Sequence, residues 1–203
     1  MFLKAESAQI ASQLRHRICM MDASSAETTL HEGSIATEFG VSRTPIRQVL
    51  QKLAYERLVE TRSGVGTIVA PLREGQRDRD LAVLSQLFLA AARCAEGVEG
   101  PRDLPQRLAA IRDSAPYADQ DAQGYLHLRA EFLEVTSDAV PDRILGDAVR
   151  AAHWRALRWR MAEQAWTDPE AFAAFDRDLE TAAGLARSGS LAEFLTFLGE
   201  RDL

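Results

Sequence analysis

The stretch from residue 31 to residue 72 constrains the fold most, because its hydrophobic spacing changes twice along the chain. Residues 31–39 carry apolar side chains one helical turn apart, and Gly40 follows as glycine does after a helix end. Ser42 is expected to cap a second helix. Pro45 falls in the first turn of that helix, where its missing N–H costs nothing because the N–H groups of a first turn have no partner within the helix. This punctuation predicts two short helices joined by a tight turn.

The helix after Gly40 buries one face and is followed by β structure. Its apolar residues recur at i, i+3, i+4 and i+7, namely Ile46, Val49, Leu50 and Leu53. The runs VETRS and TIVA, joined by Gly64-Val65-Gly66, then predict a two-stranded hairpin. Residues 6–22 add an earlier helix with one apolar stripe. Three helices and a hairpin in this order predict a winged helix-turn-helix over residues 1–72.

The polar face of the predicted third helix is suited to DNA. Arg43, Thr44 and Arg47 share the side opposite the apolar stripe, near the helix N-terminus, where arginine can enter a major groove and pair with guanine. Glycines at the hairpin tip allow close approach of the backbone to a groove or a phosphate. The predicted DNA-contacting residues are Arg43, Thr44, Arg47, Gln48, Lys52, Arg62, Gly64, Gly66 and Thr67.

The charge of the chain is uneven. Its net charge is −6 and its pI about 5.3, which is unusual for a protein that binds nucleic acid. Residues 40–73, however, hold six lysine and arginine residues against only Glu56 and Glu60. A local basic face is sufficient, because phosphate neutralisation occurs at the contact surface. The predicted partner is therefore double-stranded DNA.

The run LHEGSIATEFGVSRTPIRQVLQKLAYERLVETRSGVGTIVAP resembles the DNA-binding domain of GntR-type transcription regulators. Its parts GVSRTPIR and ERLVETRSGVGTIVAP carry the resemblance, which covers about residues 6–72. The resemblance implies base and phosphate contacts at Arg43, Thr44, Arg47 and Gly66. Family members with a further DNA-contacting arginine in the second helix carry it where this chain has Gly33, so that contact is expected to be missing.

The remainder of the chain is predicted to be a linker and a helical bundle. Residues 73–79 contain no apolar residue and are interpreted as the linker. Residues 80–203 predict an antiparallel bundle of roughly six helices, which makes the fold mostly α. The helices are expected at about 80–96, 103–113, 119–136 and 142–165, then from a capping box at Thr167 and Glu170 to about 187, and from a second capping box at Ser190 and Glu193 onward.

This second domain resembles the fatty-acid-regulator-like branch of the family, in which the bundle binds an effector and often a divalent metal held by an aspartate and three histidines. That ligand pattern falls here on Tyr125, Arg129, Leu179, and Glu200 or Arg201. The chain has only four histidines, His16, His31, His127 and His153, two of which lie in the first domain. No metal or other cofactor is therefore expected, although a set of His127, His153 and a carboxylate stays open as an alternative.

An arginine can replace the metal in the bundle. If Arg129 points inward, its guanidinium can bind the carboxylate of an organic acid directly. The segment AHWRALRWR adds aromatic and basic candidates, and the predicted effector-binding residues are Tyr125, His127, Arg129, His153 and Arg158. The alternative is structural, with Trp159 in the core and Arg155 and Arg160 solvated or in salt bridges. Leu84, Leu87 and Phe88 are candidates for the bundle core or for a dimer interface.

The predicted function is that of a ligand-responsive homodimer that binds a palindromic operator. The alternative is a ligand-independent regulator whose bundle only dimerises. An enzyme is not expected, because the sequence lacks a nucleophile–base set, a glycine-rich phosphate loop and a metal motif. Cys19 and Cys94 are interpreted as buried apolar residues in a reducing compartment. Without a signal peptide or a membrane span, a cytoplasmic location is expected.

Overall fold

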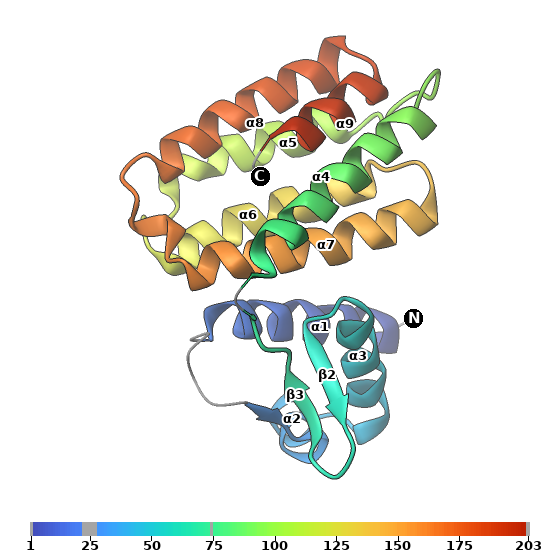
Figure 1. Cartoon of the computed structure of the whole chain (residues 1–203), viewed down its shortest axis with the longest axis vertical. Helices are drawn as coiled ribbons and strands as arrows, with labels where there is room; N and C mark the ends of the chain where they lie inside the picture. Colours follow the sequence, from blue (N-terminus) through green and yellow to red (C-terminus); the bar gives the residue numbers. More distant parts are fainter. Residues whose placement is uncertain (1, 22–27, 74, 202–203) are drawn as a thin grey trace. The chain divides into compact units, whose positions relative to one another are not determined.

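The chain divides into two compact units, residues 1–73 and 74–203. The computed structural model describes residues 2–21, 28–73 and 75–201. Figure 1 shows the helices and strands of both units. Within these described ranges, no helix combines the length and the apolarity that a membrane crossing requires.

The first unit is a winged helix-turn-helix, as predicted. Its elements are α1 (Phe2–Met20), β1 (Thr29–Leu30), α2 (Glu32–Phe39), α3 (Arg43–Tyr55), β2 (Val59–Arg62) and β3 (Gly66–Val69). The sheet has three antiparallel strands in the order β1-β3-β2, with Thr29 opposite Ile68. The prediction of a two-stranded hairpin missed β1, because a strand of two residues is too short to show an alternating pattern.

The turn between α2 and α3 explains the geometry of the helix-turn-helix. Gly40 adopts a left-handed conformation with φ of 66°, and its N–H donates to the carbonyl of Thr37 at 3.3 Å. Glycine reaches this conformation without a steric cost, so the chain can reverse direction within three residues. Ser42 occupies the N-cap position of α3, but its side chain makes no capping hydrogen bond. The predicted N-cap position is confirmed, but the capping hydrogen bond is absent and Ser42 is exposed to solvent.

The core of this unit lies between α1 and α3, which pack against each other. The predicted apolar stripes of both helices are buried: Ile10, Leu14, Ile18, Ile46, Val49, Leu50 and Leu53. One ion pair is buried with them. Arg15 of α1 donates to both carboxylate oxygens of Glu56, just after α3, at 2.8 and 2.5 Å. This pair fixes the end of α3 against α1.

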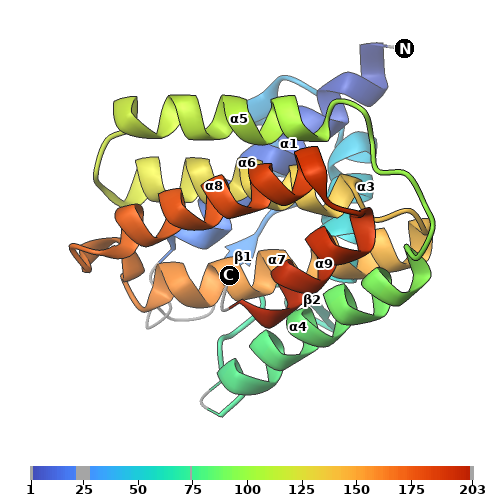
Figure 2. The ribbon, with the colours of Figure 1, turned by 90° about the horizontal axis from the view of Figure 1, so that it is seen from above.

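The second unit is the predicted bundle of six α-helices. They are α4 (Arg77–Cys94), α5 (Leu104–Ser114), α6 (Ala122–Asp138), α7 (Arg143–Ala162), α8 (Ala171–Ser188) and α9 (Leu191–Glu200), with 3-10 turns η1 (Ala115–Tyr117) and η2 (Ala165–Thr167). They pack in a closed ring in the order α4-α7-α6-α5-α8-α9 and back to α4. Neighbouring helices of this ring run in opposite directions (Figure 2). Leu84 and Phe88 lie in its core, which favours the core interpretation for them.

Several local predictions in the bundle are corrected by the structure. Helix α4 begins at Arg77, inside the predicted linker, because arginine forms helices well and the acidic Asp78 and Asp80 are favourable in a first turn. The capping box at Thr167 is absent, because α8 begins only at Ala171 and the Glu170 N–H donates to the Oδ1 of Asp168. The box at Ser190 is present with both of its hydrogen bonds. Cys94 is exposed at the end of α4 rather than buried.

Candidate functional site

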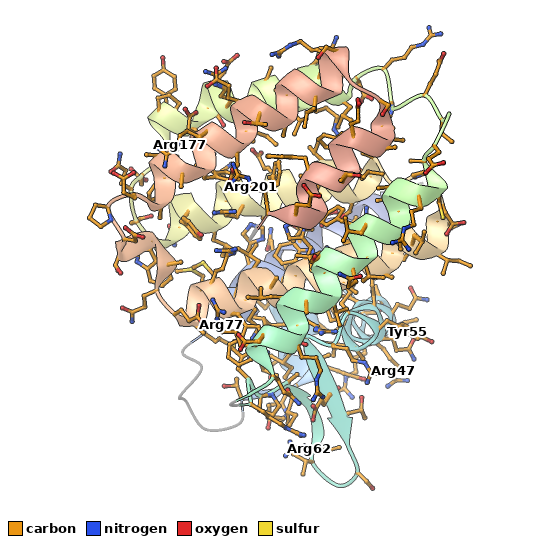
Figure 3. All side chains as sticks on the ribbon, turned by 45° about the horizontal axis from the view of Figure 1, so that its top comes forward. Arg47, Tyr55, Arg62, Arg77, Arg177 and Arg201 are labelled. Atoms are coloured by element: carbon orange, nitrogen blue, oxygen red, sulfur yellow. The ribbon has the colours of Figure 1, made fainter. Side chains whose placement is uncertain are left out.

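The outer face of α3 presents the residues predicted to contact DNA. Arg43, Thr44, Arg47, Gln48 and Lys52 are all exposed, whereas the opposite face of the helix is buried. Figure 3 shows the side chains of Arg47 and Tyr55 on this helix and that of Arg62 on the hairpin. The helix therefore offers its polar side to a partner without any rearrangement of the core.

The carboxylate of Glu32, the first residue of α2, holds Arg47 with two hydrogen bonds. The Nε of Arg47 donates to Oε1 at 3.2 Å, and its Nη2 donates to Oε2 at 2.9 Å. These hydrogen bonds lower the pKa of Glu32, with a smaller contribution from the charge of Arg43. Glu32 is thus a carboxylate close to two of the predicted DNA-contacting arginines, and the sequence analysis did not single it out.

The hairpin brings the predicted wing residues to its tip. Gly64 and Gly66 have φ angles of 76° and 107°, which other residues adopt only with strain, so glycine is required at both positions. Arg62 lies opposite Gly66 in the register and 3.5 Å from the carboxylate of Glu60. Thr67 follows on β3 and is half-buried. The glycines leave the backbone of the tip uncovered.

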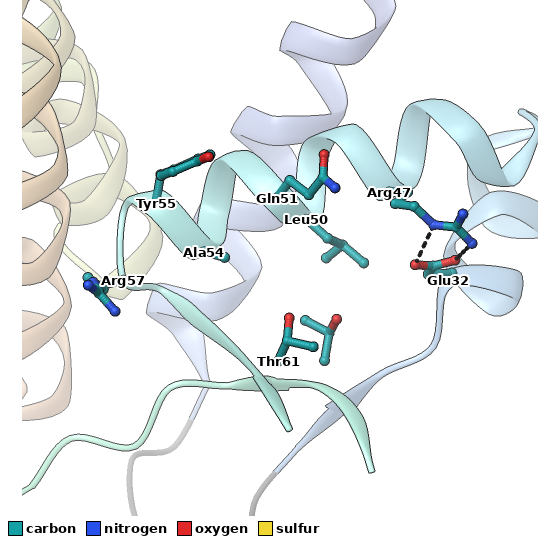
Figure 4. Close-up of a pocket in the computed structure, with 9 residues that line it drawn as sticks. Glu32, Arg47, Leu50, Gln51, Ala54, Tyr55, Arg57 and Thr61 are labelled. Atoms are coloured by element: carbon teal, nitrogen blue, oxygen red, sulfur yellow. Dashed lines mark hydrogen bonds and ion pairs between the residues drawn. The ribbon is translucent and has the colours of Figure 1, made fainter. Parts of the chain in front are cut away.

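A groove separates α3 from the hairpin (Figure 4). It has a volume of about 600 Å³ and is lined by Arg47, Gln51 and Tyr55 of α3, by Thr61 and Thr67 of the hairpin, by Arg57 after the end of α3, and by the Glu32 carboxylate that pairs with Arg47. Figure 4 places Arg47 and Arg57 toward opposite ends of the groove. Arginine at both ends, with hydroxyl groups between them, is suited to a polyanion.

Arg57 adopts an unusual backbone conformation. Its φ of 59° is left-handed, and it follows the C-terminus of α3, where glycine is the common residue. A non-glycine residue in this conformation costs about 1–2 kcal/mol. The strain is retained at the residue that places a cation in the groove, which is consistent with a functional role for that cation.

Residues 6–69 match the model of the family described as bacterial regulatory proteins, gntR family. They form a GntR-family helix-turn-helix domain. The mannosyl-D-glycerate transport/metabolism system repressor MngR of Escherichia coli (strain K12) is 36% identical to this chain over 61 residues. That match covers 30% of this chain and only 25% of MngR.

Two solved structures resemble both units. E. coli McbR/YncC is 16% identical with a TM-score of 0.65, over 96% of this chain and 93% of that one. A putative transcriptional regulator GntR from Rhodococcus sp. RHA1 is 18% identical with a TM-score of 0.62, over 98% and 96% of the two chains. At these identities the likeness shows a shared fold, a GntR-type domain followed by a helical bundle.

The bundle that follows the GntR-type domain contains a buried cation. Arg129 of α6 is only 7% exposed, and neither its Nε nor its Nη1 has a hydrogen-bond partner among the described residues. Its guanidinium carbon lies 4.3 Å from the ring centre of Phe175 and 5.2 Å from that of Tyr125. Burial lowers the pKa of Arg129, an effect that nearby Arg160 reinforces and that Tyr125 and Asp178 oppose. Arg129 points inward, which is the condition set above for its guanidinium to bind a carboxylate.

His153 of α7 is the second buried polar group. Its ring lies edge-on to Phe88 at 5.9 Å and to Phe132 at 6.4 Å, and its Nδ1 has no partner in the described parts of the chain. Burial, followed by the charges of Arg129 and Arg160, lowers the pKa of His153 to about 3. The imidazole is therefore neutral at physiological pH, and one of its ring nitrogens carries a proton that it can donate.

The other predicted effector residues divide between the interior and the surface. Tyr125 is buried beside Arg129, and Arg158 is buried on α7. His127 is largely exposed and lies 3.5 Å from the Glu131 carboxylate, so its side chain does not join this buried group. Within the described ranges no cluster of three or more histidine, cysteine, aspartate or glutamate side chains could hold a metal ion, which also leaves the alternative set of His127 and His153 unassembled.

Two residues of α7 that were weighed as effector ligands are engaged elsewhere. Arg155 and the Nε1 of Trp159 both donate to the carboxylate of Asp80 in the first turn of α4. The structural interpretation therefore holds for Arg155, whereas Trp159 is half-buried rather than fully in the core. Phe175, which stacks on Arg129, was missed because its position on the amphipathic α8 looks like that of any core residue.

Proposed function

We propose that this protein is a transcription regulator that binds double-stranded DNA through α3 and the hairpin. The observation that carries the proposal is the groove of the GntR-type domain, with exposed arginines near the start of α3 and Arg57 at the opposite end of the groove. An N-terminal helix end bearing arginines is suited to a major groove, and the glycine tip to a minor groove or a phosphate. Gln48, Lys52 and Arg62 supply further contacts.

The test is DNA binding by the full-length protein. A duplex is selected from a random pool, and its affinity is measured by fluorescence anisotropy for wild type and for Arg43→Ala and Arg47→Ala. Each substitution is expected to weaken the selected duplex by about 5- to 150-fold, the range of one arginine–guanine pair. An Arg177→Ala variant, which removes an exposed cation from α8 of the bundle, serves as the control. Unchanged affinity in both arginine variants would refute the assignment of α3.

We also propose that the bundle senses a small organic acid at Arg129. Two nitrogens of the buried guanidinium have no hydrogen-bond partner among the described residues, and a carboxylate supplies both a charge and two acceptors. The aromatic rings of Tyr125 and Phe175 suit an apolar body attached to that carboxylate. A neutral His153 nearby can donate one further hydrogen bond without adding charge.

This sensing is tested by thermal unfolding against carboxylic acids and divalent metals, each alone and combined. An acid at about 100 times its dissociation constant is expected to stabilise by about 2.7 kcal/mol, which raises the midpoint by several degrees. An Arg129→Met variant should lose the response. A requirement for metal would refute the arginine-based site, and no response to any acid would favour the alternative, a bundle that serves only as a dimerisation scaffold.

A dimer follows from the geometry of DNA contact. One recognition helix covers one half-site, and a palindromic operator presents two half-sites about one helical turn apart. We therefore propose that two copies of the chain bind one operator, in the cytoplasm and without a resident cofactor. Light scattering at micromolar concentration tests the association, and a monomer both alone and on the operator would refute it.

A further inference from the structure

The pairing of Glu32 with Arg47 leaves the end of the Arg47 guanidinium free to donate hydrogen bonds. A guanidinium has five N–H groups, one on Nε and two on each terminal nitrogen. Glu32 takes the side of the group formed by Nε and Nη2. Both N–H groups of Nη1 and the second one of Nη2 remain, and two of these form a parallel pair at the end of the side chain. That end pair is the fork that matches O6 and N7 of guanine.

The exposure and the pairing of Arg47 suit hydrogen bonding to a guanine base. Its side chain is 63% exposed, and Glu32 is its only polar partner within the described ranges. A long exposed arginine normally loses rotamer freedom when it binds DNA, and this loss weakens binding. Here the two hydrogen bonds to α2 restrict the side chain in the free protein already. The fork is therefore oriented before DNA arrives.

Arg43 depends on the same end of α2. A Cβ placed on Gly33 would lie 3.4 Å from the Nη2 of Arg43, so the guanidinium rests against the bare backbone at Gly33. A side chain longer than alanine at this position would displace it. The charge of Arg43 also lowers the pKa of Glu32, which shows that one carboxylate interacts with both arginines.

We propose that Glu32 is a specificity-determining residue, which positions Arg47 so that the free end of its guanidinium pairs with a guanine of the operator. The proposal rests on the DNA-binding function proposed above. Glu32 acts through Arg47 and makes no contact with DNA itself. Its effect is expected in the discrimination between bases and not in the total affinity.

Total affinity is a poor measure because the carboxylate also repels phosphate. Removal of one negative charge at a DNA-binding surface strengthens binding to any duplex. Glu38 offers a matched control, since it lies on the same helix and pairs with Arg17 in another exposed ion pair. A Glu38→Gln variant removes the same charge and leaves Arg47 untouched. A Glu32→Asp variant keeps the charge but shortens the side chain by one methylene, which withdraws the carboxylate from Arg47.

The experiment uses a duplex selected with wild-type protein, in which each guanine is replaced in turn by 7-deazaguanine. This base lacks the N7 acceptor and keeps every other group. Affinities of the full-length proteins are measured by fluorescence anisotropy at one salt concentration. The guanine paired with Arg47 is the one at which the replacement weakens wild type but no longer weakens Arg47→Ala.

At that guanine the replacement is expected to weaken wild type and Glu38→Gln by about 10-fold, the loss of one of two hydrogen bonds. Glu32→Gln and Glu32→Asp should lose less than about 3-fold, because an unpositioned arginine uses N7 poorly. Wild-type discrimination in both Glu32 variants would overturn the proposal while DNA binding stands. It is also overturned if no guanine shows the Arg47-dependent loss. If no duplex is enriched at all, the proposed function fails as well.

Discussion

Replacement of Arg129 by methionine is expected to make the bundle more stable. In the free protein the guanidinium is buried, and its Nε and Nη1 lack partners, each at a cost of about 1–3 kcal/mol. Stacking on the rings of Phe175 and Tyr125 offsets about 1–2 kcal/mol of this cost. Methionine fills a similar volume without polar atoms, and such replacements of buried charge are often stabilising. The net gain is expected to be about 1–3 kcal/mol.

The assay is calorimetric unfolding of the full chain without added acid. A gain of this size raises the unfolding midpoint of the bundle by about 3–9 °C and leaves the GntR-type domain unchanged. Arg155→Met is the matched control, because this arginine lies in the same bundle but has a partner in Asp80. Its loss leaves the half-buried carboxylate of Asp80 with the Trp159 hydrogen bond but without this ion pair, and should lower the midpoint.

A lower unfolding midpoint in Arg129→Met would refute the prediction that this replacement stabilises the bundle. If Arg129→Met lowers the midpoint as much as Arg155→Met does, Arg129 is a structural residue that the aromatic rings satisfy, and no anion is missing. The proposed sensing of an organic acid at this position would then lose its physical basis.

Three further predictions concern other residues. Burial lowers the pKa of His153 from 6.5 to about 3, so below pH 6.5 the unfolded chain binds a proton that the folded bundle does not accept until about pH 3. The free energy of unfolding should therefore fall by up to about 1.4 kcal/mol for each pH unit as the pH is lowered through this window. In a His153→Phe variant, urea unfolding at pH 7 and pH 5 should lack this component. Arg57→Gly relieves the left-handed strain and should stabilise the GntR-type domain by about 1 kcal/mol. The same substitution should lower the slope of log DNA affinity against log salt concentration by about one, because one phosphate contact is lost. An unchanged slope would show that Arg57 does not contact DNA. Glu56→Gln removes the carboxylate charge from the buried Arg15–Glu56 pair and should destabilise the same domain by about 3–5 kcal/mol. The double replacement of Arg15→Met with Glu56→Leu should recover most of this loss, and equal instability of both variants would argue against the ion pair.

The GntR-type domain was largely predictable because its signals are local. Apolar spacing, a glycine past a helix end and β-branched runs each act within a few residues, and the structure confirms the three helices and the hairpin that they predict. The pairing of Glu32 with Arg47 was not predictable in this way. It joins two helices across 15 residues, and nothing in the local spacing distinguishes Glu32 from a solvated acid in a first helical turn.

In the bundle, contacts between residues far apart in the sequence were even less predictable. The sequence could place Arg129 on a helix but left its direction open, because arginine is usually exposed and only tertiary packing decides otherwise. Phe175, more than 40 residues away along the chain, provides the ring on which the guanidinium stacks. The Thr167 capping box failed for a related reason, since the Glu170 N–H that Thr167 was expected to accept from donates to the nearer carboxylate of Asp168.

The closed ring of the bundle has a consequence for how the protein folds. Its first helix, α4, packs against its last, α9, and the Ser85 hydroxyl donates to the Gly199 carbonyl at 2.5 Å across 114 residues. Two further neighbouring pairs, α4 with α7 and α5 with α8, are separated along the chain. The remaining neighbouring helices of the ring follow each other directly in sequence. Contacts of large sequence separation carry the largest loop-closure entropy and form late. During synthesis the GntR-type domain therefore has all its core residues long before α9 emerges, and the bundle closes last.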